Sequence, residues 1–265
     1  MRWINRLFNS TNMNVHIRFT WWILCSMGMM LLSCHKENPS SSGNIPSANY
    51  QAVGASAHDL LSDVPYSSLQ IEIAYMPGYQ PDNQAQQQLQ SFLQTYLHKS
   101  GGIHITTHQI PDAGKSTYSL QDVMQMESSY RTQFTTGNQI AVFILYVNGQ
   151  YTDPQVLGIT YLNTSMCIFA KTIHDNSGGI GQISRSTAEA TVLEHEFGHM
   201  LGLVNIGSPM QTPHEDTSHP HHCNNSNCLM YYQTETSDLF GFLIGSQVPS
   251  LDSNCVHDLE ANGGK

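Results

Sequence analysis

The pattern of apolar and polar residues predicts a sheet whose strands alternate with helices. Apolar and polar positions alternate over residues 69–75 (LQIEIAY), which predicts a strand, and residues 103–110 predict a second one. Residues 139–147 (QIAVFILYV) are almost entirely apolar, which predicts a central strand covered on both faces. Residues 156–170 are expected to hold one or two further strands.

Three segments show the spacing of helices. Residues 82–98 place apolar side chains on one helical face, namely Leu89, Phe92, Leu93, Tyr96 and Leu97. Residues 120–134 predict a second helix. A third is expected to begin at a capping box formed by Ser186 and Glu189 and to run to about Leu201. The order of these elements predicts a single α+β domain built on a mixed sheet.

The N-terminal segment has the build of an export signal. Three arginines precede an uncharged apolar run over residues 19–32, which is shorter than the ~20 residues that span a bilayer. The run ends just before Cys34 and resembles a bacterial lipobox, which implies a cleaved signal peptide over residues 1–33 and a lipid on Cys34. A short transmembrane anchor is the alternative. Residues 34–54 then form a flexible tether, and residues 55–265 form the folded domain.

The charge of the chain argues against one class of partner. All 20 acidic residues follow Cys34, but only seven of the ten basic residues do, which leaves a net charge of −13 after that cysteine. A chain this acidic is not expected to bind nucleic acid through phosphate contacts. With the export signal, the composition predicts a monomer in the cell envelope, outside the cytoplasm and held to the membrane by its N-terminal lipid.

The segment VLEHEFGHMLG carries residues that suit a metal site. His195 and His199 are four residues apart, so a helix places both rings on one face, where they can share one zinc ion. Glu196 follows the first histidine and can reach a metal-bound water without binding the ion itself. The alternative is a chance match on a surface helix, but the motif is surrounded by apolar residues, as a buried helix requires.

The same residues resemble the metzincin metallopeptidases. His195, Glu196, His199 and Gly202 match that family's HExxHxxG pattern, but Asn205 stands where a third histidine or aspartate is expected. The later segment HCNNSNCLM resembles archaemetzincins, in which a third histidine precedes Cys-x4-Cys-x-Met. The resemblance covers about 45 residues and implies a metzincin-like catalytic domain with one catalytic Zn²⁺.

The third ligand remains open between several residues. By the archaemetzincin pattern it is His222, which lies beside Cys223 and eight residues before the methionine. The main rival is His214, because Asp216 is close enough in sequence to orient its ring. Other candidates lie in the same stretch, namely Asp216, His219 and His221.

Two further residues take roles from the resemblance. Met230 corresponds to the methionine turn that lies under the metal in metzincins. The alternative is that it is an ordinary core methionine, and the two roles are compatible. Tyr232 follows two residues later, where some metzincins place a tyrosine that touches the zinc or the reacting oxyanion. A tyrosine that merely packs is the alternative.

Four cysteines remain after Cys34, and export permits disulfides. Archaemetzincins bind a second zinc with four cysteines, but their later Cys-x-x-Cys pair is absent here. We therefore expect Cys223 and Cys228 to form a short disulfide, and Cys167 to pair with Cys255. Metal thiolates are the rival interpretation for Cys223 and Cys228.

These features predict a zinc metalloendopeptidase that acts on peptides or proteins. In this interpretation the metal activates a water and Glu196 is the general base. The alternative is a surface lipoprotein that binds a partner and whose zinc is structural. A structural site has four protein ligands and no use for Glu196, so this residue favours the enzyme.

Overall fold

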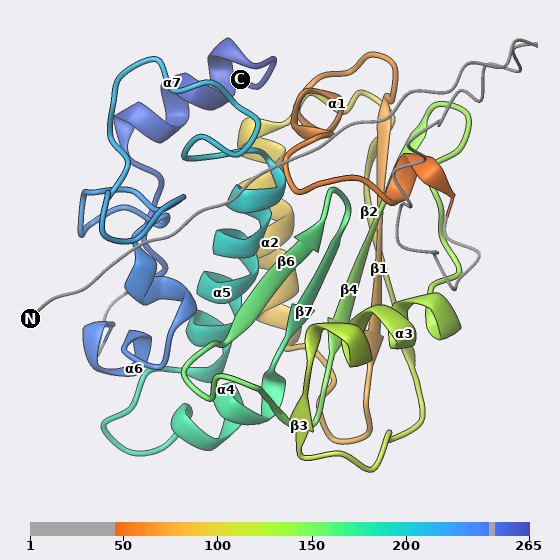
Figure 1. Cartoon of the computed structure of the whole chain (residues 1–265), viewed down its shortest axis with the longest axis vertical. Helices are drawn as coiled ribbons and strands as arrows, with labels where there is room; N and C mark the ends of the chain where they lie inside the picture. The colour runs from red at the N-terminus through yellow and green to blue at the C-terminus, as the bar shows by residue number, and fades with distance from the viewer. Residues whose placement is uncertain (1–45, 244–246) are drawn as a thin grey trace, which may run out of the picture. The chain divides into compact units, whose positions relative to one another are not determined.

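Five strands form one mixed sheet in the order β2-β1-β4-β7-β6 (Figure 1). The computed structural model describes residues 46–243 and 247–265. The strands of this sheet are β1 (Ser68–Tyr75), β2 (Gly102–Gln109), β4 (Gln139–Tyr146), β6 (Gly158–Leu162) and β7 (Ser165–Ile168). The first four in spatial order are parallel, and β6 lies antiparallel to β7 at the edge. The predicted α+β class with a mixed sheet is confirmed.

The central strand β4 is buried on both faces, as its apolar sequence predicts. From Ile140 to Tyr146 every residue is buried. Ile140, Val142, Ile144 and Tyr146 join the larger core cluster, and Phe143 and Leu145 join a smaller one on the opposite face. Side chains alternate between the faces of a strand, so one apolar strand supplies both cores.

Helices lie on both faces of the sheet (Figure 1). The helical elements are η1 (Ser47–Asn49), α1 (Ala57–Leu61), α2 (Asn83–Tyr96), α3 (Leu120–Tyr130), α4 (Ala170–Asn176), α5 (Arg185–Met200), η2 (Tyr232–Glu235), α6 (Leu239–Phe242) and α7 (Ser253–Ala261). A separate pair of short strands consists of β3 (Thr117–Tyr118) and β5 (Gln150–Tyr151). Helix α3 ends four residues before the predicted Phe134, because Arg131 leaves helical geometry and its side chain donates to the carbonyl of Gln133.

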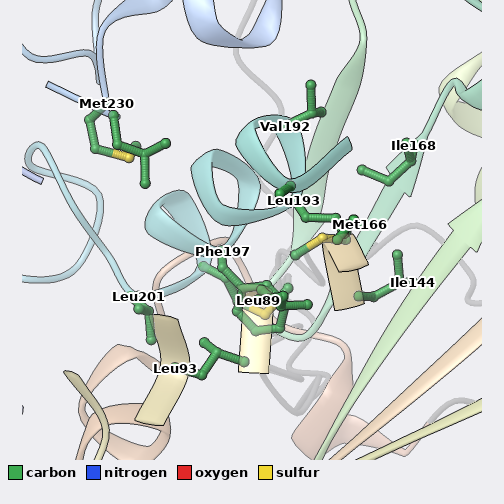
Figure 2. Close-up of a cluster of buried hydrophobic side chains, with 14 of the residues drawn as sticks. Leu89, Leu93, Ile144, Met166, Ile168, Val192, Leu193, Phe197, Leu201 and Met230 are labelled. Atoms are coloured by element: carbon green, nitrogen blue, oxygen red, sulfur yellow. The ribbon is translucent and has the colours of Figure 1, made fainter. Parts of the chain in front are cut away.

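Helices α5 and α2 pack against each other on one face of the sheet. Figure 2 shows Leu193 and Phe197 of α5 packed among Leu89 of α2 and Met166 of β7. The predicted capping box at Ser186 is wrong, because the N-cap is Ser184, whose hydroxyl accepts the N–H of Thr187 at 3.0 Å.

Glu189, which was predicted to complete the capping box, instead contacts two other helices. The carboxylate of Glu189 is buried and accepts the backbone N–H of Asp82 at 2.9 Å, with His174 Nε2 at 2.9 Å. It therefore links α5 to the start of α2 and to α4.

The folded part begins before the predicted boundary at residue 55. Asn49 was expected in the tether, but it is fully buried, and its amide donates to the carbonyl of Ala141 and to the hydroxyl of Thr164. The predicted signal peptide and Cys34 lie outside the described residues. Within residues 46–243 and 247–265, no helix combines the length and the apolar character that crossing a bilayer requires.

A buried ion pair joins helix α3 to the sheet. Arg131 Nη1 lies 2.8 Å from Glu127 Oε1, and both side chains are fully buried. The guanidinium also donates to the carbonyl of Ala141 on β4, and Glu127 Oε1 accepts the hydroxyl of Ser165 on β7 at 2.6 Å. Each charge therefore depends on the other, because water cannot replace the missing partner.

We predict that Glu127→Ala lowers the free energy of unfolding by ~3–5 kcal/mol, because it leaves the Arg131 charge buried and unpaired. Urea denaturation followed by circular dichroism measures the change. Glu260→Ala, at an exposed position on α7, is the control and should change stability by less than ~0.5 kcal/mol. A loss below ~1 kcal/mol in Glu127→Ala would contradict the role assigned to the pair.

Candidate metal centre

Helix α5 places two histidines side by side, as the spacing predicts. His195 is fully buried, His199 is 7% exposed, and their ring centroids are 4.7 Å apart. Helix α5 ends at Met200, and two residues later Gly202, with a φ of +79°, permits the sharp turn that sends the chain back. A Cβ at this glycine would lie 2.4 Å from Ser208 N, so the returning backbone has no room for a side chain.

The structure brings His222 to these two rings. Its centroid lies 5.3 Å from that of His195 and 5.1 Å from that of His199. The rival His214 lies elsewhere, where its Nε2 pairs with Asp258 Oδ2 at 2.8 Å. The ligand atoms that the three histidines and Glu235 offer all lie within 4.8 Å of one another.

Backbone carbonyls orient two of the three imidazoles. His195 Nδ1 lies 2.8 Å from the carbonyl oxygen of Leu229, and His222 Nδ1 lies 3.1 Å from that of Pro220. A carbonyl can only accept, so both Nδ1 atoms carry hydrogen, and each ring in its neutral form presents a lone pair on Nε2.

Those Nε2 atoms point at a shared space and not at a hydrogen-bond partner. In the described part of the chain, His195 Nε2 and His222 Nε2 are buried without any such partner. Burial also lowers the pKa of His199 to about 4, which keeps that ring neutral. Three converging imidazoles, two of them oriented by backbone carbonyls, fit a bound metal ion such as zinc.

Glu235 completes the cluster and was not predicted. Its Oε2 lies 3.5 Å from His195 Nε2 and 3.6 Å from His199 Nε2, and its Oε1 lies 3.1 Å from His222 Nε2. The histidines outweigh the opposing effect of burial and hold the pKa of Glu235 well below its usual range. No motif marks this glutamate, because only the fold of η2 places it among the rings.

Glu196 lies beside the cluster and is held from the edge strand. Its carboxylate is buried, and its Oε2 accepts the hydroxyl of Thr160 on β6 at 2.8 Å. Its Oε1 has no hydrogen-bond partner among the described residues. Burial, and then the charge of Glu235, raise the pKa of Glu196 well above its usual range. A Cβ at Gly158 would lie 2.8 Å from that Oε1, so β6 leaves space for the carboxylate only because this residue is glycine.

Met230 packs under the active-site helix, as Figure 2 shows. A Cβ at Gly198 would lie 2.2 Å from Met230 Sδ, so the sulfur touches the helix backbone between the two histidines. Tyr232 stacks on His219, with ring centroids 3.6 Å apart and an interplanar angle of 2°. The structure therefore gives Tyr232 a packing contact with a loop histidine.

A second cluster of ligand-type side chains lies close by. His214, Cys223, Asp252 and Cys255 offer ligand atoms within 4.8 Å of one another. His214 Nδ1 lies 3.4 Å from Cys223 Sγ and 3.9 Å from Cys255 Sγ, and Cys228 Sγ lies 3.6 Å from Cys255 Sγ.

The predicted disulfides are absent from the described residues. Cys167, Cys223, Cys228 and Cys255 are all buried free thiols. A pairing of Cys167 with Cys255 is wrong because these residues belong to two different cores. Cys223 and Cys228 also lie close to His214 and Cys255, so the pairing of Cys223 with Cys228 stays a prediction and metal thiolates stay its rival. The fold places His214 beside Cys223 and Cys255 beside Cys228, which the spacing of the cysteines in the sequence does not predict.

No protein-family model and no curated protein matches the sequence. Solved structures with a similar fold include the following two. Archaemetzincin from Methanopyrus kandleri is 13% identical, with a TM-score of 0.48, over 75% of this chain and 98% of that one. Metalloproteinase-II from Bacteroides fragilis is 17% identical, with a TM-score of 0.42, over 76% of this chain and 54% of that one. The chain thus spans about half of the B. fragilis protein, and both likenesses are distant.

Proposed function

We propose that the protein is a zinc-dependent metalloendopeptidase. The observation that carries this proposal is the convergence of three imidazoles, on His195, His199 and His222, beside the buried carboxylate of Glu196. A zinc ion held there would lower the pKa of a bound water and polarise the scissile carbonyl. The alternative, a lipoprotein with a structural zinc, does not explain why a buried carboxylate at Glu196 lies beside the three imidazoles.

Glu196 is arranged to move a proton. Thr160 holds its Oε2, so Oε1 is the atom free to take a proton from the attacking water. Burial favours the neutral form of this carboxyl, and the proton can next pass to the leaving amine. Thr160 lies on β6, so the same strand that flanks the site also orients the base.

The edge of the sheet suits a peptide substrate. β6 is the last strand in the sheet order, and within the described chain only β7 pairs with it. An extended peptide can add to the other side of β6 through backbone hydrogen bonds, which would carry its carbonyl groups past Glu196. We further propose that the enzyme is a monomer held in the cell envelope by a lipid on Cys34, and that it does not bind nucleic acid.

We also propose a second, structural zinc ion in the cysteine cluster. Ligands of one tetrahedral zinc lie about 3.5–3.8 Å apart when sulfur is among them, and the observed separations are 3.4, 3.6 and 3.9 Å. The buried carboxylate of Asp258 binds His214 Nε2 and leaves Nδ1 facing the thiols. A site of this kind has four protein ligands and no open position.

Cys228 is the best fourth ligand of this second site. Hydrogen bonds from Cys223 and Cys255 lower the pKa of Cys228, which favours the thiolate form that zinc binds. The backbone N–H groups of Met230 and Asp252 also point at its sulfur, at 3.4 and 3.3 Å. The carboxylate of Asp252 is already engaged, since it accepts from Asn225 and caps α7.

We predict that Glu196→Gln keeps the metal of the histidine site and loses at least ~100-fold in peptidase activity, because the amide retains the contact with Thr160 but cannot take the proton. Zinc content by elemental analysis and turnover of a fluorogenic peptide measure the two effects. Glu194→Gln is the matched control, since it removes the adjacent carboxylate, which lies outside the cluster. Full turnover in Glu196→Gln at full zinc content would exclude Glu196 as the base.

We predict two zinc ions per chain, each held by its own set of ligands. His222→Ala should lower zinc affinity at the first site at least ~10-fold and remove activity, while the cysteine site stays filled. Cys255→Ser should release the other ion and lower the thermal midpoint, because a structural metal stabilises the fold that binds it. Elemental analysis of both variants after dialysis measures this. A single zinc per chain that survives Cys255→Ser would refute the second site.

A further inference from the structure

Glu235 lies where a fourth ligand of the catalytic metal would lie. We propose that its carboxylate is the resting fourth ligand, so that the metal held by His195, His199 and His222 has no open position until a substrate displaces Glu235. This inference rests on the proposed metal site. It adds that the enzyme would be inactive until a substrate displaces Glu235 from the metal. Latency of this kind needs no separate propeptide.

The distances favour shared coordination over direct pairing. Atoms bound to one tetrahedral zinc at ~2.0–2.2 Å lie roughly 3.3–3.6 Å from one another. The oxygens of Glu235 lie 3.1, 3.5 and 3.6 Å from the three Nε2 atoms. Neither His195 Nε2 nor His222 Nε2 forms a hydrogen bond to it or to any other described residue. The carboxylate and the imidazoles therefore surround one point.

Glu235 is also the member of the cluster best able to leave. Its side chain is 24% exposed, whereas those of His195, His199 and His222 are 0%, 9% and 11% exposed. The three rings are held by the helix and by backbone carbonyls, but the carboxylate can turn toward water. A movable carboxylate ligand beside three fixed imidazoles is suited to exchange.

The backbone under Glu235 is fastened to the chain that leads into β6. The N–H of Leu157 donates to the carbonyl of Glu235 at 2.8 Å, and Thr236 forms a bridge with Val156. Displacement is therefore a rotation of the side chain and not a movement of the segment. A peptide that pairs with β6 would pass Glu235. Binding of the peptide on the edge strand would therefore bring it to the carboxylate that it has to displace.

The experiment uses Co²⁺ in place of zinc and acetohydroxamate as a small competing ligand. In Glu235→Gln and Glu235→Ala, Co²⁺ affinity at the histidine site should fall at least ~10-fold, because one ligand is lost. Acetohydroxamate should bind the cobalt form of both variants at least ~10-fold more tightly than it binds the wild type, because it no longer displaces a carboxylate. Visible absorption of cobalt reports both quantities, with His195→Ala as the baseline for the cysteine site.

Glu215→Gln is the matched control. Its carboxylate is also 24% exposed and also lies near a histidine, but outside the cluster, so both affinities should stay at wild-type values. Suppose that both Glu235 variants bind Co²⁺ and acetohydroxamate as the wild type does, and that His195→Ala still removes the metal. This result would overturn the role of Glu235 as the resting ligand but would not contradict the proposed peptidase. If His195→Ala does not change metal content, the proposed function itself fails.

Discussion

The hydrogen bond between His195 Nδ1 and the carbonyl of Leu229 joins the active-site helix to the loop beneath it, and the candidate metal centre depends on that bond. It fixes which nitrogen of His195 faces the cluster. Leu229 lies between Cys228, whose sulfur is 3.6 Å from that of Cys255, and Met230, whose sulfur touches the helix backbone at Gly198. The same loop therefore orients a ligand, supports the helix and contributes a thiol.

The two clusters are consequently coupled through the chain. His222 belongs to the first cluster and its neighbour Cys223 to the second, and the N–H of Cys223 donates to the carbonyl of Met230 at 2.7 Å. A metal in the cysteine cluster would restrict the loop that carries the third histidine. The entropy of ordering that loop would then be lost on folding and not when the catalytic metal binds. Preorganisation of this kind explains how a ligand 23 residues beyond His199 can be held as firmly as one on the helix.

Local sequence spacing was sufficient to predict most of the strands of the sheet and the proximity of the two histidines on α5. The strands, helix α2 and the pairing of His195 with His199 follow from local spacing, which a fixed helical or strand geometry converts directly into positions. The capping box was wrong because Ser184 and Ser186 are both plausible caps, and tertiary contacts of Glu189 decide between them. Boundaries of this kind are settled by partners far away in sequence.

The remaining errors share one physical origin. The sequence offers Cys223 and Cys228 as neighbours, but their environment is completed by His214 and by Cys255, which lies on α7. Glu235 likewise carries no local signal and enters its cluster only because its backbone bonds to Leu157. Long-range contacts choose among chemically similar residues, and a single sequence contains no record of that choice.

The most direct test of the account is a crystal structure of the zinc-loaded protein with anomalous diffraction data collected above and below the zinc absorption edge. The account predicts an anomalous peak between the Nε2 atoms of His195, His199 and His222, at coordination distances of ~2.0–2.1 Å. Absence of a peak at that point, with the three imidazoles in place, would contradict the metal centre on which the proposed function rests.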